Sequence, residues 1–170
     1  MPLAWISLGS NLGDRRAHLA AALKALRAPE LGLQAHSRVW ETEPVGYAEQ
    51  PAFLNMAARL ATRLPPGELL TALQAIEKAE GKATPFRWGP RSLDLDIMLY
   101  EGQALALPEL TLPHPRLHER AFMMGPLLEL DPELAHPLLG LSFHELLQSL
   151  PPGHPAARPV GNLDSLTERP

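Results

Sequence analysis

Two amphipathic helical stretches, each lying between strand-like runs, most constrain how this chain can fold. Residues 15–27 and 65–80 repeat apolar side chains at the spacing of one helix face, namely Leu19, Ala22, Leu23 and Leu26, then Leu69, Ala72, Leu73 and Ile76. Asp14 is placed to cap the first helix, and prolines open the second. Strand-like runs cover residues 3–8, 31–42, 52–64 and 92–101. The order strand, helix, strand, strand, helix, strand is that of the split βαβ unit.

This order predicts an α+β, ferredoxin-like βαββαβ core. Its sheet is antiparallel, with helices packed on one face and the other face free to carry a site. A C-terminal helical and proline-rich extension follows, with short helices expected near residues 115–120 and 142–150. We expect residues 1–150 to form a single domain and residues 151–170, which hold five prolines, to form an extended tail.

Composition narrows the possible functions. The chain has 170 residues and a net charge of −4, so no broad basic surface is available for nucleic acid. It lacks cysteine, which excludes disulfides, thiolate metal sites and a cysteine nucleophile. No stretch approaches the roughly 20 apolar residues of a membrane span, and we read no secretory signal at the N-terminus. We therefore expect a monomer in the cytoplasm without a membrane or nucleic-acid partner. Nineteen prolines fit either heat adaptation or a biased genome.

The strongest chemical signal lies in residues 87–96, where two arginines, a tryptophan and a Gly-Pro pair precede Asp94 and Asp96. Side chains two positions apart leave a strand on the same face, with Cα atoms about 7 Å apart. Such a carboxylate pair beside arginines suits Mg²⁺ and a polyphosphate, because Mg²⁺ prefers oxygen ligands. The alternative is that the pair belongs to the solvated face of a half-buried strand, which is the commoner case for an isolated Asp-x-Asp.

Three weaker signals each have an ordinary structural alternative, and a fourth, at residues 80–84, is rejected. The turn at residues 9–13 could admit an anion at a helix N-terminus or be a plain tight turn. Residues 80–84 lack the spacing of a Walker loop. His114 and Arg120 could bind phosphate or form a solvated basic face, and His114 with His118 lacks a third zinc ligand. Phe53 beside Asn55 suits a flat heterocycle, or else packs in the core and caps a turn.

Taken together, these motifs resemble the 6-hydroxymethyl-7,8-dihydropterin pyrophosphokinase family of folate biosynthesis. The matching stretches are residues 7–12, 43–46, 50–55, Gln74 and Glu77, 87–91, 93–97, and 113–114 with Arg120 and Phe122. They come in the family's order and span residues 4 to about 130. The run from Arg87 into the Asp pair is the most specific of them.

The resemblance implies transfer of pyrophosphate from ATP to the pterin hydroxymethyl group, releasing AMP, with two Mg²⁺ ions bound by Asp94 and Asp96. It implies Asp94, Asp96, Arg91 and Lys82 as catalytic residues. The implied ATP-binding residues are Gln74, Glu77, Trp88, Arg91, Ile97, Thr111, His114 and Arg120. The implied pterin-binding residues are Thr42, Val45, Phe53, Asn55 and Phe122. Asp96 is also our hypothesis for the acceptor of the hydroxyl proton.

The chain departs from the family pattern at three positions. Lys82 and Glu109 stand where arginine is common, and Phe53 replaces a tyrosine. Lysine keeps the charge without the planar fork, whereas Glu109 reverses the charge, so no ATP contact is assigned to it. The rival functions are a nucleotidyltransferase, an RNA-binding ferredoxin-like module and a non-catalytic family member. The separation of Gly9 and Asp94 in the sequence argues against the nucleotidyltransferase, in which the two elements lie close together along the chain. The acidic net charge argues against the RNA-binding module, and the intact Asp pair argues against a non-catalytic member.

Overall fold

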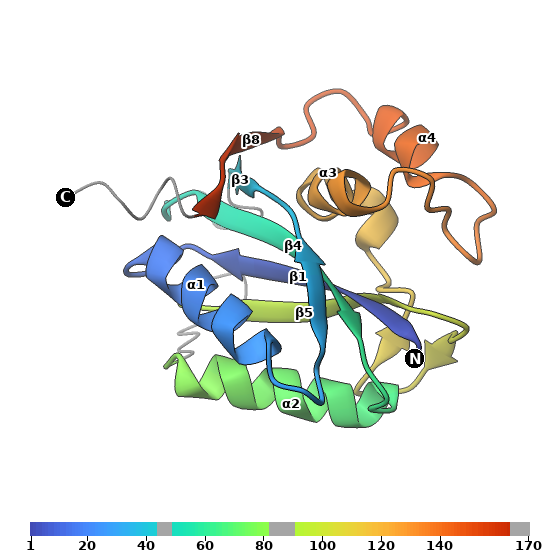
Figure 1. Ribbon diagram of the computed structural model, residues 1–170. Coiled ribbons are helices and arrows are strands. Elements are labelled where there is room, and N and C mark those ends of the chain that lie inside the picture. The colour runs from blue at the N-terminus through green and yellow to red at the C-terminus, as the bar shows by residue number, and fades with distance from the viewer. Residues whose placement is uncertain (44–48, 82–90, 164–170) are drawn as a thin grey trace.

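The computed structural model describes residues 1–43, 49–81 and 91–163. Its sheet is built around β1 (Leu3–Ser10), which pairs antiparallel with β4 (Phe53–Ala61) on one side and with β5 (Asp94–Tyr100) on the other (Figure 1). The strand order is β5-β1-β4-β3-β8. The order of the first four of these strands is that of the predicted ferredoxin-like core, in which the first and third core strands lie side by side. The predicted α+β fold is therefore confirmed.

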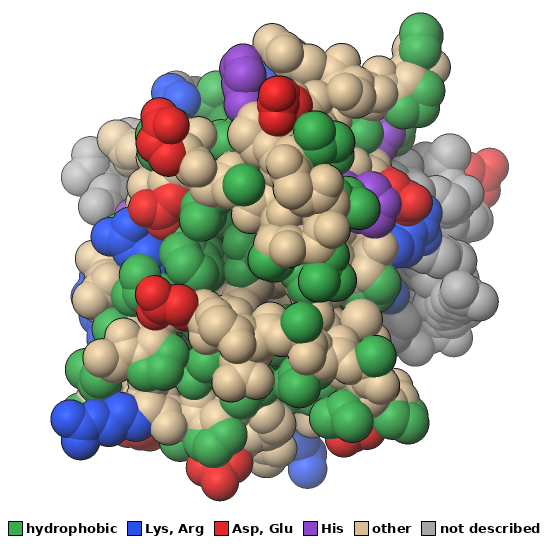
Figure 2. Space-filling model, turned by 90° about the vertical axis from the view of Figure 1, so that its right-hand side faces the viewer, with side chains coloured by type: hydrophobic (Ala, Val, Ile, Leu, Met, Phe, Trp, Pro, Cys, Tyr) green, Lys and Arg blue, Asp and Glu red, His purple; other side chains and the backbone are tan. Residues whose placement is uncertain are grey.

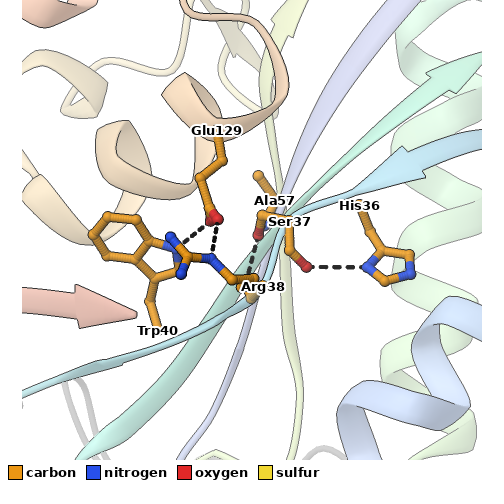
Figure 3. Close-up of polar contacts among 6 residues, drawn as sticks. All are labelled: His36, Ser37, Arg38, Trp40, Ala57 and Glu129. Carbon is orange, nitrogen blue, oxygen red and sulfur yellow. Dashed lines mark hydrogen bonds and ion pairs between the residues drawn. The ribbon is translucent and has the colours of Figure 1, made fainter. Parts of the chain in front are cut away.

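The run predicted as one strand over residues 31–42 is two strands, β2 (Leu33–His36) and β3 (Val39–Thr42). Both pair with β4, and Ser37 lies at the break between them. The Ser37 hydroxyl accepts a hydrogen bond from the Ala57 backbone N–H at 2.9 Å and donates one to the Arg38 carbonyl at 2.7 Å (Figure 3). A buried side chain thus satisfies backbone groups that the interrupted ladder leaves without partners.

The two helices of the core, α1 (Arg15–Leu26) and α2 (Pro66–Ala79), cover one face of the sheet, as predicted (Figure 1). The Asp14 carboxylate accepts from the Ala17 N–H at 3.0 Å and caps α1, and Gly81 follows α2 at a positive φ. The apolar stripes of both helices pack with Ile6, Leu8 and Met56 from the sheet. This is the larger of the two hydrophobic clusters.

The opposite face of the sheet, which was predicted to be free, is in fact partly covered. There α3 (Ala121–Leu130) and α4 (Phe143–Gln148) pack over a second hydrophobic cluster that includes Trp5, Met98 and Phe143. The helix expected near residues 115–120 is a single 3₁₀ turn, η1 (Leu117–Glu119), and α3 was not predicted. The helix expected near residues 142–150 is confirmed as α4, with a capping box between Ser142 and Glu145.

Two carboxylates at the C-terminal end of α3 bind this helix to the sheet. Glu129 accepts from Arg38 Nε and from Trp40 Nε1, both at 2.6 Å (Figure 3). Asp131 accepts from Trp5 Nε1 at 2.6 Å and from an Arg59 guanidinium nitrogen at 2.7 Å. Each carboxylate therefore meets one indole and one arginine, and these charge-assisted bonds fix where α3 lies on the sheet.

The C-terminal segment adds a strand to the sheet. Residues 151–170 were predicted as a tail apart from the domain, but β8 (Ala157–Gly161) pairs antiparallel with β3 at the edge (Figure 1). A small hairpin of β6 (Leu105–Ala106) and β7 (Thr111–Leu112) follows β5. Among the described residues, no helix is long and apolar enough to cross a membrane.

Charged side chains are sparse on one face of the molecule (Figure 2). On the face drawn in Figure 2, the described Lys and Arg side chains are few and separated from one another, and acidic side chains lie between hydrophobic ones. This distribution agrees with the net charge of −4 and differs from the basic stripe that nucleic-acid binding requires.

Gly125 of α3 is a direct test of how this helix packs. A Cβ atom added there would lie 2.6 Å from the Trp40 ring, whereas one added at Gly67 in α2 would meet nothing within 4 Å. We expect Gly125→Ala to lower the free energy of unfolding by about 1 to 3 kcal/mol through overpacking. Gly67→Ala should be neutral or stabilising, because alanine favours a helix. Urea unfolding measures both, and equal effects of the two substitutions would contradict the packing of α3 on Trp40.

Candidate active site

An open cavity lies on the part of the sheet that α3 and α4 leave uncovered. Its lining comes from β1, β3, β4, β5, α3 and the residues that flank them, namely Ser7, Gly9, Thr42, Glu43, Phe53, Asn55, Arg91, Asp94, Asp96, Arg120 and Phe122. Eight of the sequence-predicted site residues are in this set. Segments far apart in the sequence therefore meet at one place, as the predicted free face of the sheet requires.

Asp94 and Asp96 both line the cavity, so the prediction that they share a face is confirmed. They lie opposite Gly9 and Ser7 of β1, respectively, whose small side chains leave space above the strand. An Arg91 guanidinium nitrogen donates to Asp94 Oδ2 at 3.0 Å. Half-buried carboxylates beside a guanidinium are suited to a divalent cation and a phosphate chain.

Asp94 and Asp96 fit a Mg²⁺ ion that is only partly coordinated by protein. No group of three or more His, Cys, Asp or Glu side chains within the described ranges could hold a metal by itself. Mg²⁺ commonly takes one or two protein carboxylates and completes its coordination with water and substrate phosphates. Asp94 and Asp96 match that pattern, and a cysteine-free, two-carboxylate site does not match a structural zinc centre.

Asn55 and Phe53 lie across β1 from the Asp pair. Asn55 is buried, and its Nδ2 donates to Thr42 Oγ1 at 2.7 Å, which fixes the orientation of the amide. Gly9 is opposite both Asn55 and Asp94 in the ladders. A Cβ atom at Gly9 would lie 3.6 Å from the Phe53 ring, which is an ordinary contact, but only 3.2 Å from Asn55 Oδ1, so a side chain here would displace the Asn55 amide slightly.

The N-terminal end of α3 supplies the next part of the wall. The Arg120 guanidinium carbon lies 5.4 Å from the centre of the Phe122 ring, within the range of a cation–π contact. Burial lowers the pKa of Arg120, and Arg116 adds to the effect, while Asp96 and Asp94 oppose it. Arg120 remains a cation that faces both carboxylates.

His114 lies between β7 and η1, near this cation. Its backbone N–H donates to the Met98 carbonyl at 2.9 Å, and its ring Nδ1 accepts from the Arg116 N–H at 3.1 Å. Burial, followed by the charge of Arg120, lowers the pKa of His114 to about 4, with Asp94 opposing and Arg116 adding to the effect. At neutral pH the ring is uncharged, and Nε2 carries the proton because Nδ1 is an acceptor.

Five described residues that were predicted to bind ATP do not line the cavity, namely His114, described above, and four others. Ile97 is buried in the α1–α2 core because the alternation of β5 turns it away from Asp96. Glu77 is also buried, and its carboxylate accepts from the Leu95 N–H at 2.8 Å, which attaches α2 to β5. Gln74 is exposed on α2, and Thr111 is exposed on β7. Val45, Lys82 and Trp88 lie outside the described residues.

Sequence reasoning missed three residues of the lining: Ser7, Gly9 and Glu43. Ser7 and Gly9 are two positions apart on β1, so they lie on the same face of the sheet, and this spacing could have indicated both residues. The spacing was not used because the strand was predicted to end at residue 8, whereas β1 continues to Ser10. Glu43 directly follows β3; it belongs to the matching stretch 43–46 but was assigned no role in the site.

Comparison with known proteins identifies the family. The model of the family 7,8-dihydro-6-hydroxymethylpterin-pyrophosphokinase (HPPK) matches residues 5–132. The chain belongs to this family. It is 47% identical over 148 residues to the Pseudomonas aeruginosa 2-amino-4-hydroxy-6-hydroxymethyldihydropteridine pyrophosphokinase, covering 86% of this chain and 91% of the relative. The Bacillus subtilis enzyme of the same name is 43% identical over 129 residues, covering 75% of this chain and 77% of the relative.

The HPPK fold is also present in larger proteins. A Pisum sativum mitochondrial folate synthesis bifunctional protein is 45% identical over 125 residues, which cover 74% of this chain and 24% of that protein. Wild-type HPPK-DHPS of Plasmodium falciparum superposes with a TM-score of 0.65 at 15% identity. That match covers 87% of this chain and 43% of the other, so it supports the fold alone.

The low pKa of His114 predicts a pH dependence of stability. Its folded-state pKa of about 4 lies below the ordinary value of 6.5, so below pH 6.5 the unfolded chain takes up the proton first. The free energy of unfolding should therefore fall as the pH drops from 7.5 towards 4, with a contribution from His114 of about 2 kcal/mol at pH 5. In His114→Asn, whose Oδ1 can replace Nδ1, this contribution should vanish.

Urea unfolding at pH 7.5 and pH 5 measures the loss of stability in each protein. His144→Asn changes an exposed histidine of α4 and is the matched control, so it should behave like the wild type. An equal loss of stability in the wild type and in His114→Asn would show that His114 is not the responsible group.

Proposed function

We propose that this chain transfers pyrophosphate from ATP to 6-hydroxymethyl-7,8-dihydropterin at the cavity described above, and releases AMP. The observation that carries the proposal is the meeting of two groups of residues in one cavity. Asp94, Asp96, Arg91 and Arg120 suit a metal-bound triphosphate, and Thr42, Asn55, Phe53 and Phe122 suit a flat heterocycle. Membership of the HPPK family supports both assignments.

The acceptor would lie between the aromatic rings of Phe53 and Phe122, with its polar edge towards Asn55. A pterin edge presents hydrogen-bond donors and acceptors side by side, and a primary amide offers one of each. Because the Asn55 amide is hydrogen-bonded to the buried Thr42 hydroxyl, its side chain is held in place before the ligand binds. The acceptor hydroxymethyl group would then point across Gly9 towards the Asp pair.

The nucleotide would place its phosphates among Asp94, Asp96, Arg91 and Arg120. Asp94 and Asp96 would hold two Mg²⁺ ions, which when bound neutralise phosphate charge and polarise the acceptor hydroxyl. Arg91 and Arg120 would bind phosphate oxygens, and the neutral His114 would donate from Nε2 without adding charge. Among the predicted contacts outside the cavity, Gln74, Thr111 and the backbone of Ile97 would bind the nucleotide away from the reacting atoms.

The reaction requires an in-line arrangement. The hydroxymethyl oxygen attacks the β-phosphorus, the bond from that phosphorus to the α–β bridging oxygen breaks, and AMP leaves with the electron pair. The hydroxyl proton must leave during this step, and Asp96 is the carboxylate to which we assign it. Phosphoryl transfer needs little covalent help from the protein, so positioning and charge neutralisation supply most of the rate.

The first test is AMP formation from ATP, with and without the pterin, in Mg²⁺ and in EDTA. We expect AMP only when pterin and metal are both present, and at least a hundredfold lower rate in Asp96→Ala, because the phosphate charge is no longer neutralised. Glu133→Ala removes an exposed acid outside the cavity and should be unaffected. AMP formed without pterin would contradict the assigned acceptor, and full activity of Asp96→Ala would contradict the assigned site.

The acceptor half of the site is tested by Asn55→Leu, which keeps the shape of the side chain and removes its polar atoms. The KM for the pterin should rise at least tenfold, while the KM for ATP stays within about twofold, because only the heterocycle edge loses its partners. Met56→Leu alters the next residue, which faces the core on the other side of β4, and is the control. Equal changes of both KM values in Asn55→Leu would argue against a pterin contact at Asn55.

A further inference from the structure

Asn11 is a completely buried amide at the end of β1, outside the cavity lining, and the proposed mechanism does not use it. Its backbone N–H donates to the Arg91 carbonyl at 3.0 Å, and its side-chain Oδ1 accepts from the Arg91 N–H at 2.8 Å. Both polar groups of the Arg91 backbone are therefore held by one residue. This pair of hydrogen bonds, the Arg91 bracket, fixes the position of the Arg91 backbone, from which the side chain reaches Asp94.

The other end of the same amide holds a different segment. Asn11 Nδ2 donates to Gln50 Oε1 at 2.7 Å and to the Pro51 carbonyl at 3.1 Å. One residue further along, the Ala52 carbonyl accepts from an Arg15 guanidinium nitrogen at 2.7 Å. These contacts fix residues 50–52, which lead directly into Phe53 and Asn55 on the acceptor side of the cavity.

The geometry of the amide makes these two attachments dependent on each other. Oδ1 and Nδ2 belong to one planar group, so a rotation that improves the contact with Arg91 also moves the donor that serves Gln50 and Pro51. The side chain is buried, so water cannot replace either partner at low cost. At the end of the same turn, the Asp14 carboxylate caps α1 by accepting from the Ala17 N–H.

We propose that Asn11 is a positioning residue that couples the two halves of the active site. It holds Arg91, on the nucleotide side, in a fixed relation to residues 50–52, on the acceptor side. Binding of either substrate then favours the arrangement that the other requires, and by linkage each tightens the other. This inference rests on the proposed function, because it assumes that the two halves bind ATP and the pterin.

The experiment compares the wild type with Asn11→Ala. Pterin affinity is measured by its fluorescence, with and without a non-hydrolysable ATP analogue in Mg²⁺, and turnover is measured as pterin-dependent AMP. In the wild type the analogue should tighten pterin binding at least fivefold. In Asn11→Ala this factor should fall close to one, and kcat should fall at least tenfold, while the affinity for each ligand alone changes less than threefold.

Ser37→Ala is the matched control, because Ser37 is a buried polar residue whose hydroxyl also bonds to backbone groups, but far from Arg91 and Gln50 along the sheet. It should lose stability, yet keep the coupling factor and kcat per folded molecule. Similar coupling factors and kcat in Asn11→Ala and the wild type would overturn the proposal, as would a wild type in which the analogue leaves pterin affinity unchanged.

A second variant covers the case in which Asn11→Ala does not fold. Gln50→Leu removes one partner of the amide on the acceptor side and leaves the Arg91 bracket in place. It should reduce the coupling factor at least twofold without changing the affinity for the ATP analogue alone. An unchanged coupling factor in Gln50→Leu would then overturn the proposal. A wild type that forms no pterin-dependent AMP would instead refute the proposed function, so the two failures are distinguishable.

Discussion

The register of β1 between its two neighbours determines where every part of the site lies. Gly9 is opposite Asn55 on one side and Asp94 on the other, so the two halves of the cavity are separated by one strand. In an antiparallel sheet, a slip of one residue would turn Asp94 and Asp96 into the core. The apolar residues that alternate with them, Leu95 and Ile97, prevent this slip because they pack beneath α1 and α2.

The second constraint is the placement of α3. Arg120 and Phe122 stand at its N-terminal end, and Glu129 and Asp131 attach its C-terminal end to Trp40 and Trp5. The helix has no polar face to define its orientation, since most of its residues from Ala121 to Leu127 are buried. The paired bonds from indoles and arginines supply that orientation. They lie at the end of the helix remote from the cavity, so the anchor and the site do not compete for the same residues.

The sequence allowed prediction of the parts of the fold that have a clear period. The stripes of α1 and α2 and the alternation around Asp94 and Asp96 gave the βαββαβ order and the carboxylate pair. The sequence could not reveal α3, because residues 121–130 are apolar almost throughout and contain Pro126, so no helical period stands out. The sequence also could not reveal β8, because its one proline, Pro159, suits an edge strand but equally suits an irregular segment. The role of Glu77 depended on a contact with Leu95 that only the packing of α2 on β5 creates.

The turn after β1 illustrates how local and long-range requirements combine. Read locally, glycine, serine and asparagine beside a helix N-terminus suit either an anion or a tight turn. In the folded protein the helix end is occupied by Asp14, and the asparagine is turned inward, with partners 80, 39 and 40 residues away. A neutral amide suits this position, because it offers a donor and an acceptor without burying a charge beside Arg91. An aspartate would lose the donors to Gln50 and Pro51 and add a charge that burial penalises. The choice of asparagine therefore follows from the two segments that its amide connects, at Arg91 and at residues 50–51. A neutral amide can connect distant segments close to the charged residues of the site without adding a buried charge.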